Sequence, residues 1–229
     1  MHGERGAEEL SLEGERTGPI LHRSQRDVVV SALLEGIADG TLAPGMKLTV
    51  SNLAGQLDVS SATIREALGA LNALHLIDEH PNRPARVVTP TPRWYVAMAA
   101  ECVGLSIAAA DLGIALATPQ QRADFCLCAE KSRRAWRESD DQYLASVSLW
   151  ELIQLLANYS TNRYLADLHA QKRHALAFGL KHLSQPRNAN MLIATIDALT
   201  VAVQAGDRDE GVDIVRDLYA FVIGPFVEV

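Results

Sequence analysis

The stretch that decides the fold is LDVSSATIREALGALNALHLI, residues 57–77. Ser60 is a residue type that caps helix N-termini, and behind it Ile64 and Leu68 recur at the spacing of one helical face. Arg65 lies on the opposite face of the same predicted helix. The pattern therefore predicts a helix that packs its apolar side on a small core and leaves a polar side for a partner.

Two helical patterns precede this helix. Ser24 and Asp27, three residues apart, form a capping-box pattern at the start of the first, and Gly40 is a typical C-terminal glycine. Thr49 is in position to cap the second helix, which ends near Leu57. Because few residues separate the second helix from the third, the two are predicted to form a helix-turn-helix.

Two short apolar runs follow the third helix. LHLIDE (74–79) and ARVV (85–88) flank the tight turn HPNRP (80–84). They predict a small β-hairpin, the wing. In a helix-turn-helix the second helix of the pair enters the DNA major groove and presents its N-terminal residues to the base edges. The order of elements over residues 22–88 therefore predicts a winged helix-turn-helix domain.

The rest of the chain, residues 93–229, holds almost no strand pattern. The segment 187–205 is apolar nearly all round, so we expect it at the centre of a helical bundle. The predicted fold class is mainly α, with an N-terminal winged helix-turn-helix domain that carries a small β-hairpin wing and a C-terminal antiparallel bundle of about six helices. Breakers and capping residues place these helices at 93–114, 118–138, 141–158, 162–183, 187–205 and 208–224.

Composition changes along the chain define the domains. Residues 1–21 are acidic and Gly-rich and are predicted to be a disordered tail. Two prolines in TPTPR suit a short, stiff linker at 89–92. We expect the winged domain at 22–88 and the helical domain at 93–229.

Charge and cysteine content narrow the class of protein. The formal net charge is −7, and residues 22–90 hold six Lys or Arg against seven Asp or Glu. This balance argues mildly against nucleic acid as the main partner, so a DNA-binding claim must rest on local geometry. Three cysteines are an odd, sparse set that favours a reducing, cytoplasmic compartment. No uninterrupted apolar run reaches the ~18 residues of a transmembrane helix, so no membrane partner is expected.

Several stretches carry a family pattern: ALLEGIADGTLAPGMKL, LAGQLDVS and IREALGAL between residues 28 and 88, then NRYLADL (162–168) and AVQAGDRDEG (202–211). The first three resemble the winged helix-turn-helix domain of the GntR family of bacterial transcription regulators. The last two are similar to motifs of the effector-binding domain of the FadR subfamily. The resemblance implies a homodimeric regulator that binds double-stranded DNA and a small-molecule effector. We find no catalytic motif and expect no enzyme.

The DNA-contacting surface is predicted from the helix-turn-helix and the wing. Hydroxyls at a helix N-terminus suit a phosphate, and Arg65 can reach a guanine or a phosphate. Arg83 and Arg86 lie near the wing turn. The predicted DNA-binding residues are Thr49, Ser51, Ser60, Ser61, Ala62, Thr63, Arg65, Arg83 and Arg86.

The chain also departs from the family pattern. Ser51 stands where relatives have an arginine entering the second helix, Ser61 replaces the arginine after the capping serine, and Pro84 replaces the wing glycine. Arg65 alone matches a family DNA-contacting arginine. We therefore expect an altered operator and weaker phosphate contacts. The alternative is a helical sensing or scaffolding module with weakened or lost DNA binding.

Relatives similar to the FadR subfamily often hold a metal with one Asp and three His. The corresponding positions here are Leu149, Ile153, Ile196 and Leu218. Because such a metal needs imidazole or carboxylate ligands, we expect no metal and no cofactor. A shifted site that uses Glu151 or Asp197 is the open alternative. His169, His174 and His182 lack the i, i+4 spacing of a helical metal site and are expected to be at the surface or partly buried.

Apolar residues at the expected metal positions predict an apolar cavity that fits a hydrophobic acid or acyl effector. Arg134 and Asp197 could supply its polar contacts. The predicted ligand-binding residues are Arg134, Leu149, Trp150, Ile153, Ile196, Asp197, Leu218 and Tyr219. An equally open reading is that these residues only pack the bundle.

Overall fold

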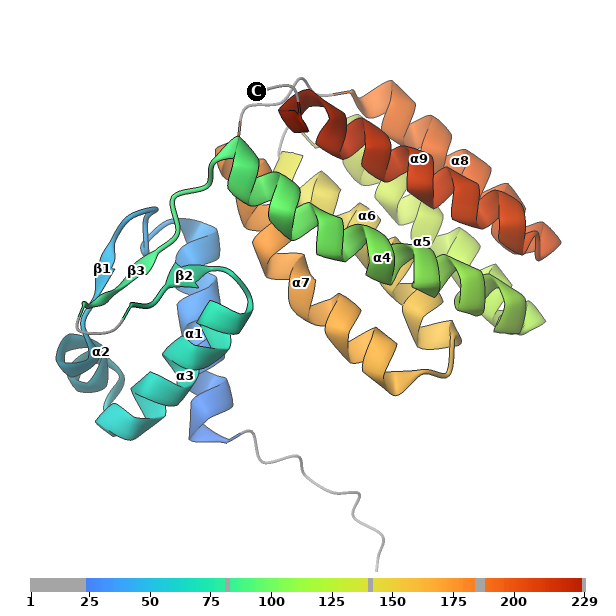
Figure 1. Cartoon of the computed structure of the whole chain (residues 1–229). Helices are drawn as coiled ribbons and strands as arrows, with labels where there is room; N and C mark the ends of the chain where they lie inside the picture. Colours follow the sequence, from blue (N-terminus) through green and yellow to red (C-terminus); the bar gives the residue numbers. More distant parts are fainter. Residues whose placement is uncertain (1–23, 81–82, 140–141, 184–187, 228–229) are drawn as a thin grey trace, which may run out of the picture.

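The computed structural model describes residues 24–80, 83–139, 142–183 and 188–227, so the predicted tail at 1–21 lies outside it. A winged unit is followed by a helical bundle (Figure 1). The winged unit contains α1 (Gln25–Asp39), β1 (Lys47–Leu48), α2 (Val50–Leu57), α3 (Ser61–Ala73), β2 (Ile77–Asp78) and β3 (Ala85–Val87). The bundle contains α4 (Pro92–Leu116), α5 (Pro119–Glu138), α6 (Gln142–Tyr159), α7 (Arg163–His182), α8 (Ala189–Ala205) and α9 (Arg208–Val227). The predicted fold class is confirmed.

Local capping determines where the first helix starts and ends. The Ser24 hydroxyl accepts a hydrogen bond from the Asp27 amide at 3.2 Å, and the Asp27 carboxylate accepts one from the Ser24 amide at 3.3 Å. At the other end Gly40 adopts φ 94°, a left-handed conformation that glycine reaches without steric cost. The helix between them turns its apolar side toward α3.

One apolar core holds the winged unit together. Each side chain buried in it stabilises the fold by about 1.5–3 kcal/mol relative to exposure. The core residues come from α1, α3 and the sheet: Val29, Leu33, Ile37, Ile64, Leu68, Leu71, Ile77 and Val87.

The wing is a three-stranded antiparallel sheet in the order β1-β3-β2. The sequence predicted only a two-stranded hairpin. The strand β1 was missed because two residues show no alternation, and its pairing depends on Arg86 lying opposite Lys47. The strand β2 is shorter than predicted, since Leu74 ends α3 and His75 turns the chain at φ 60°.

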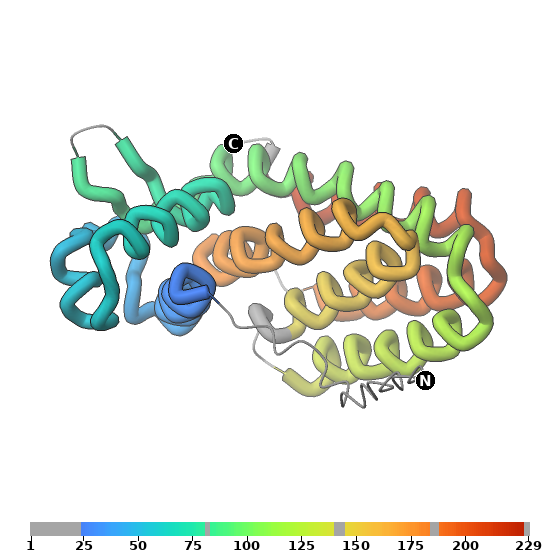
Figure 2. The backbone as a smooth tube through the Cα atoms, turned by 90° about the horizontal axis from the view of Figure 1, so that it is seen from below, coloured from blue at the N-terminus to red at the C-terminus, as the bar shows by residue number. Residues whose placement is uncertain are grey.

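The central helix of the bundle is α4, which packs against α9, α6 and α7. Figures 1 and 2 show these helices running side by side with α4. The prediction that 187–205 lies at the centre is wrong. The helix α8 packs mainly on α5 and α9 and leaves Ala194, Ala198 and Val201 exposed. Apolar composition alone did not distinguish a buried face from an uncovered one.

By length and composition alone, α4 could cross a membrane. One such helix is weak evidence for a membrane span, because the core helix of a globular domain can be as long and as apolar. Here α4 packs against α9, α6 and α7, and 39% of its most apolar 18-residue stretch is buried.

Small residues on α4 let its neighbours approach. A Cβ atom added at Gly113 would lie 2.2 Å from the Leu156 carbonyl oxygen on α6. Only glycine fits where two helix backbones come this close. This contact therefore fixes the crossing of α4 and α6.

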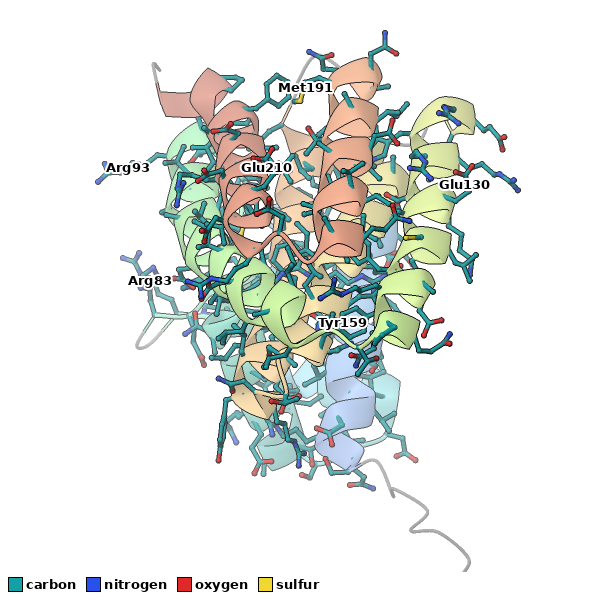
Figure 3. The ribbon with its side chains drawn as sticks, turned by 90° about the vertical axis from the view of Figure 1, so that its right-hand side faces the viewer. Arg83, Arg93, Glu130, Tyr159, Met191 and Glu210 are labelled. Carbon is teal, nitrogen blue, oxygen red and sulfur yellow. The ribbon has the colours of Figure 1, made fainter. Side chains whose placement is uncertain are left out.

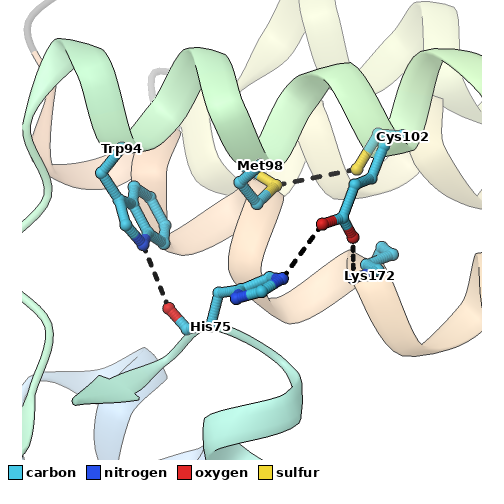
Figure 4. Close-up of polar contacts among 6 residues, drawn as sticks. His75, Trp94, Met98, Cys102 and Lys172 are labelled. Atoms are coloured by element: carbon cyan, nitrogen blue, oxygen red, sulfur yellow. Dashed lines mark hydrogen bonds and ion pairs between the residues drawn. The ribbon is translucent and has the colours of Figure 1, made fainter.

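Polar contacts join the winged unit to the bundle. The Trp94 indole donates to the His75 carbonyl oxygen at 3.2 Å, and the His75 imidazole lies 3.1 Å from Glu101 (Figure 4). Lys172 of α7 pairs with the other oxygen of Glu101 and, as the largest influence, lowers the pKa of that carboxyl. Lys181 donates to the Ala38 carbonyl oxygen at 2.5 Å, near the end of α1. The winged unit and the bundle are therefore joined by hydrogen bonds and an ion pair, in addition to the chain that connects them.

We predict that Gly113→Ala destabilises the protein by about 1–3 kcal/mol, because the new methyl group meets backbone that cannot rotate away. Chemical denaturation with urea measures the loss. The matched control is Gly104→Ala on the same helix, where an added Cβ meets open space. This control should gain about 0.5–1 kcal/mol from helix propensity. Equal effects of the two substitutions would contradict the close approach.

Candidate DNA-binding surface and bundle cavity

The turn between α2 and α3 sets the N-terminus of the candidate recognition helix. Asp58 adopts φ 51°, and the Val59 amide donates to the Ala54 carbonyl oxygen at 3.2 Å. The Ser60 hydroxyl then accepts a hydrogen bond from the Thr63 amide at 3.1 Å. The Ser60 and Thr63 hydroxyls also bond each other at 2.9 Å. Ser60 and Thr63, both predicted to bind DNA, thus also take part in the hydrogen bonds that cap the N-terminus of α3.

The outer face of α3 is free for a partner. Ser61, Ala62 and Arg65 are exposed, while Ile64 and Leu68 on the inner face are buried. Within the described ranges, Arg65 forms no hydrogen bond or ion pair. The buried face of α3 holds the helix in place, and the Arg65 guanidinium on the opposite face is available to contact a base edge or a phosphate.

The start of α2 borders this face. Thr49 occupies the N-cap position, but its hydroxyl makes no capping hydrogen bond. Ser51, in the first turn, is exposed. The first amides of α2 therefore keep donors that a phosphate could accept.

The two wing arginines differ in their surroundings. Arg86 donates to the Gly45 carbonyl oxygen at 2.9 Å, so this side chain braces the loop before β1. Arg83 follows residues 81–82, which lie outside the described chain, and its side chain extends away from the molecule in Figure 3. Arg83 is thus the freer of the two. Figures 1 and 2 place α2, the start of α3 and the wing together at the end farthest from the bundle.

A cavity of about 60 Å³ lies in the bundle. Five predicted ligand-binding residues line it: Leu149, Trp150, Ile153, Leu218 and Tyr219. Sequence reasoning missed other lining side chains, among them Trp136, Leu176 and Leu192, because nothing local separates them from ordinary core residues.

Three predicted ligand-binding residues lie elsewhere. Ile196 is fully buried in the core but does not line the cavity. Arg134 points outward from α5, 3.9 Å from Glu138. Asp197 bonds Arg133 at 2.6 Å. The expectation that Arg134 and Asp197 supply polar contacts to the cavity is therefore corrected. The arginine that faces α8 is Arg133, and Asp197 is already paired with it.

Behind the cavity lies a buried hydrogen-bonded chain that the sequence did not reveal. His169 was expected at the surface or partly buried but is fully buried, and its ring stacks on Trp150 with centroids 3.9 Å apart. His169 Nδ1 donates to Gln154 Oε1 at 2.7 Å, which leaves Nε2 to accept from Ser106 at 3.1 Å. The Ser106 hydroxyl in turn accepts from Tyr219 at 2.9 Å. Each donor in this chain has one acceptor, so the imidazole is held neutral.

The described part of the chain holds no group of three or more His, Cys, Asp or Glu residues that could bind a metal. The side chains at the four expected metal positions are apolar. Of the alternative ligands, Glu151 pairs with Arg173 at 3.0 Å and Asp197 pairs with Arg133. The donor set around the cavity does not fit a metal.

We predict that stability falls below neutral pH because of His169. Burial lowers its pKa from 6.5 to about 4. At pH values between these two pKa values, His169 is protonated in the unfolded chain but not in the folded protein. The free energy of unfolding therefore decreases as pH falls, by up to about 3 kcal/mol. His169→Gln removes this contribution and should flatten the dependence. Urea unfolding at about pH 7 and pH 5 measures it, with circular dichroism as the control for folding. A variant with an unchanged slope would contradict the assignment.

The chain is similar in sequence to known transcription regulators. A model of the family described as bacterial regulatory proteins, gntR family, matches residues 25–87. The HTH-type transcriptional regulator McbR of Escherichia coli (strain K12) is 26% identical over 197 residues, covering 84% of this chain and 88% of that protein.

Solved structures show the same fold over nearly the whole chain. The structure of E. coli McbR/YncC has a TM-score of 0.68 at 22% identity and covers 89% of this chain and 97% of that one. A putative transcriptional regulator GntR from Rhodococcus sp. RHA1 has a TM-score of 0.66 at 18% identity, with 90% and 99% covered. The winged helix-turn-helix of residues 25–87 is therefore similar to that of the gntR family of bacterial regulatory proteins, and the chain as a whole shares the fold of McbR.

Proposed function

We propose that this protein is a ligand-responsive transcription regulator that binds operator DNA as a homodimer. It acts in the cytoplasm and not as an enzyme. The observation that carries the proposal is the exposed, unpaired Arg65 at the N-terminal part of α3 in a gntR-type domain. In a helix-turn-helix this is the part of the helix that meets base edges. We assign DNA binding to residues 22–88 and effector binding and dimerisation to residues 93–229, in the manner of the FadR subfamily.

The location of the cavity supports ligand response. Leu176 and Leu180 of α7 line the cavity. On the same turns, Phe178 and Lys181 lie against Ile37 and Ala38 of α1. The last turns of α7 are therefore a wall one helix thick between the cavity and the winged unit. A ligand that prefers one position of this wall shifts DNA affinity by its difference in binding energy between the two positions.

A second candidate is a sensing or scaffolding module that no longer binds DNA well. The near balance of charge in the winged region favours it, since DNA-binding surfaces are usually basic. Salt dependence separates the two functions, because a protein that neutralises phosphates loses affinity as log salt rises.

We predict that Arg65→Ala weakens binding to a duplex selected by the protein from a random pool. The expected loss is about 1–3 kcal/mol if Arg65 contacts a base. If it contacts a phosphate, the loss is similar for unrelated duplexes. Fluorescence anisotropy measures both. The control is Arg163→Ala, which removes the same charge from a 91% exposed side chain. Arg163 is the first residue of α7, whereas the last turns of that helix contact the winged unit. Unchanged affinity in Arg65→Ala would favour the scaffolding module.

We also predict a dimer that is disrupted by charge on the outer face of α5 and α8. Leu127 and Val201 are each about two-thirds exposed on these adjacent helices. Leu127→Glu with Val201→Glu should convert a dimer at micromolar concentration to a monomer in light scattering. Tyr164→Glu, at an 83% exposed position on α7, should leave the dimer intact. A wild-type monomer would overturn the homodimer, and a dimeric double variant would move the interface elsewhere.

A further inference from the structure

The wall of the bundle cavity carries no cationic side chain among the residues that the structure describes. Leucine, isoleucine and aromatic side chains form most of it, for example Leu149, Ile153 and Leu192. Directly behind the Trp150 ring lies His169, whose burial lowers its pKa to about 4 and leaves it neutral near pH 7. A carboxylate placed here would lose its hydration and meet no opposite charge.

Trp150 brings a buried indole donor into this wall. Trp150 is 3% exposed, and its indole N–H finds no acceptor among the described residues. Nearly all buried donors in folded proteins are paired, and an unpaired one costs free energy. The neighbouring Tyr219 hydroxyl already donates to Ser106, so that hydroxyl is occupied, whereas the Trp150 indole can donate to a ligand.

The size and opening of the cavity limit the ligand. Its volume of about 60 Å³ is small beside the roughly 300–1,000 Å³ of drug-sized pockets. Phe221 and Asn188 are exposed at its edge, while Trp150 and Ile153 are buried. A molecule larger than this volume can therefore direct one end at the indole while the rest of it lies at the open edge beside Phe221.

We propose that the cavity binds a small, uncharged molecule with an apolar body and one hydrogen-bond acceptor directed at the Trp150 indole N–H. This inference rests on the proposed effector role of the bundle. It replaces the hydrophobic acid that the sequence predicted. Burial of the apolar body contributes the affinity, and the acceptor selects among molecules of the same shape.

Three compounds of matched shape test the ligand class: 1-indanone, indane and indane-1-carboxylate. The chain contains three tryptophans, so an ¹H–¹⁵N spectrum of the full protein shows three indole signals. We expect 1-indanone to shift the Trp150 signal and to bind more tightly than indane, while the carboxylate binds least. Tighter binding of the carboxylate than of the ketone would overturn the proposal.

Variants separate the hydrogen bond from the shape of the cavity. Trp150→Phe identifies the Trp150 signal by its loss. This change should reduce the preference for 1-indanone over indane by roughly three- to tenfold, the value of one hydrogen bond. The matched control is Trp94→Phe, since Trp94 donates to His75 outside the cavity and should leave the preference unchanged. An unchanged preference in Trp150→Phe would also overturn the proposal.

DNA binding distinguishes this inference from the proposed function. If 1-indanone binds as expected and alters affinity for the selected duplex, both are supported. If it binds in the expected order but leaves DNA affinity unchanged, the ligand class is supported and the effector role fails. If the duplex binds normally while the carboxylate alone binds the cavity, the regulator stands and the uncharged ligand class is overturned.

Discussion

The close packing of α4 is the constraint on which the other features depend. Gly113 allows the backbone of α6 to approach, and α7 and α9 pack on the remaining sides of the same helix. These contacts fix α6, which carries Trp150, relative to α7, which carries His169. The stacked ring pair and the cavity beside it follow from that arrangement. A wider spacing at Gly113 would alter both.

The second organising element is α7, which has different partners along its two sides. One side forms the cavity wall through Leu176 and Leu180, and the other contacts α1 through Phe178 and Lys181. The ion pair between Lys172 and Glu101 ties α7 to α4 beside the His75 turn. The helix α7 therefore contacts the winged unit directly, in addition to the short linker that joins the two units along the chain.

The sequence predicted features that short-range chemistry determines. The caps at Ser24 and Ser60 and the glycine stop at Gly40 depend on residues within one turn, and the structure confirms them. It did not predict features that depend on distant partners. Burial of His169 requires hydrogen bonds from two other helices, which no spacing in its own helix indicates. For the same reason Arg134 was preferred to its neighbour, because only the packed structure shows which arginine faces α8.

The division of α3 into two faces has an evolutionary consequence. The inner residues Ile64 and Leu68 determine stability, whereas Ser61, Ala62 and Arg65 contact little of their own protein. Exchanges on the outer face are therefore nearly neutral for folding, since exposed substitutions usually change stability by less than about 0.5 kcal/mol. Under the proposed function, this face can change its DNA preference while the scaffold stays the same. A library randomised at these outer positions would therefore yield mostly folded proteins, and under the proposed function these would differ in their DNA targets.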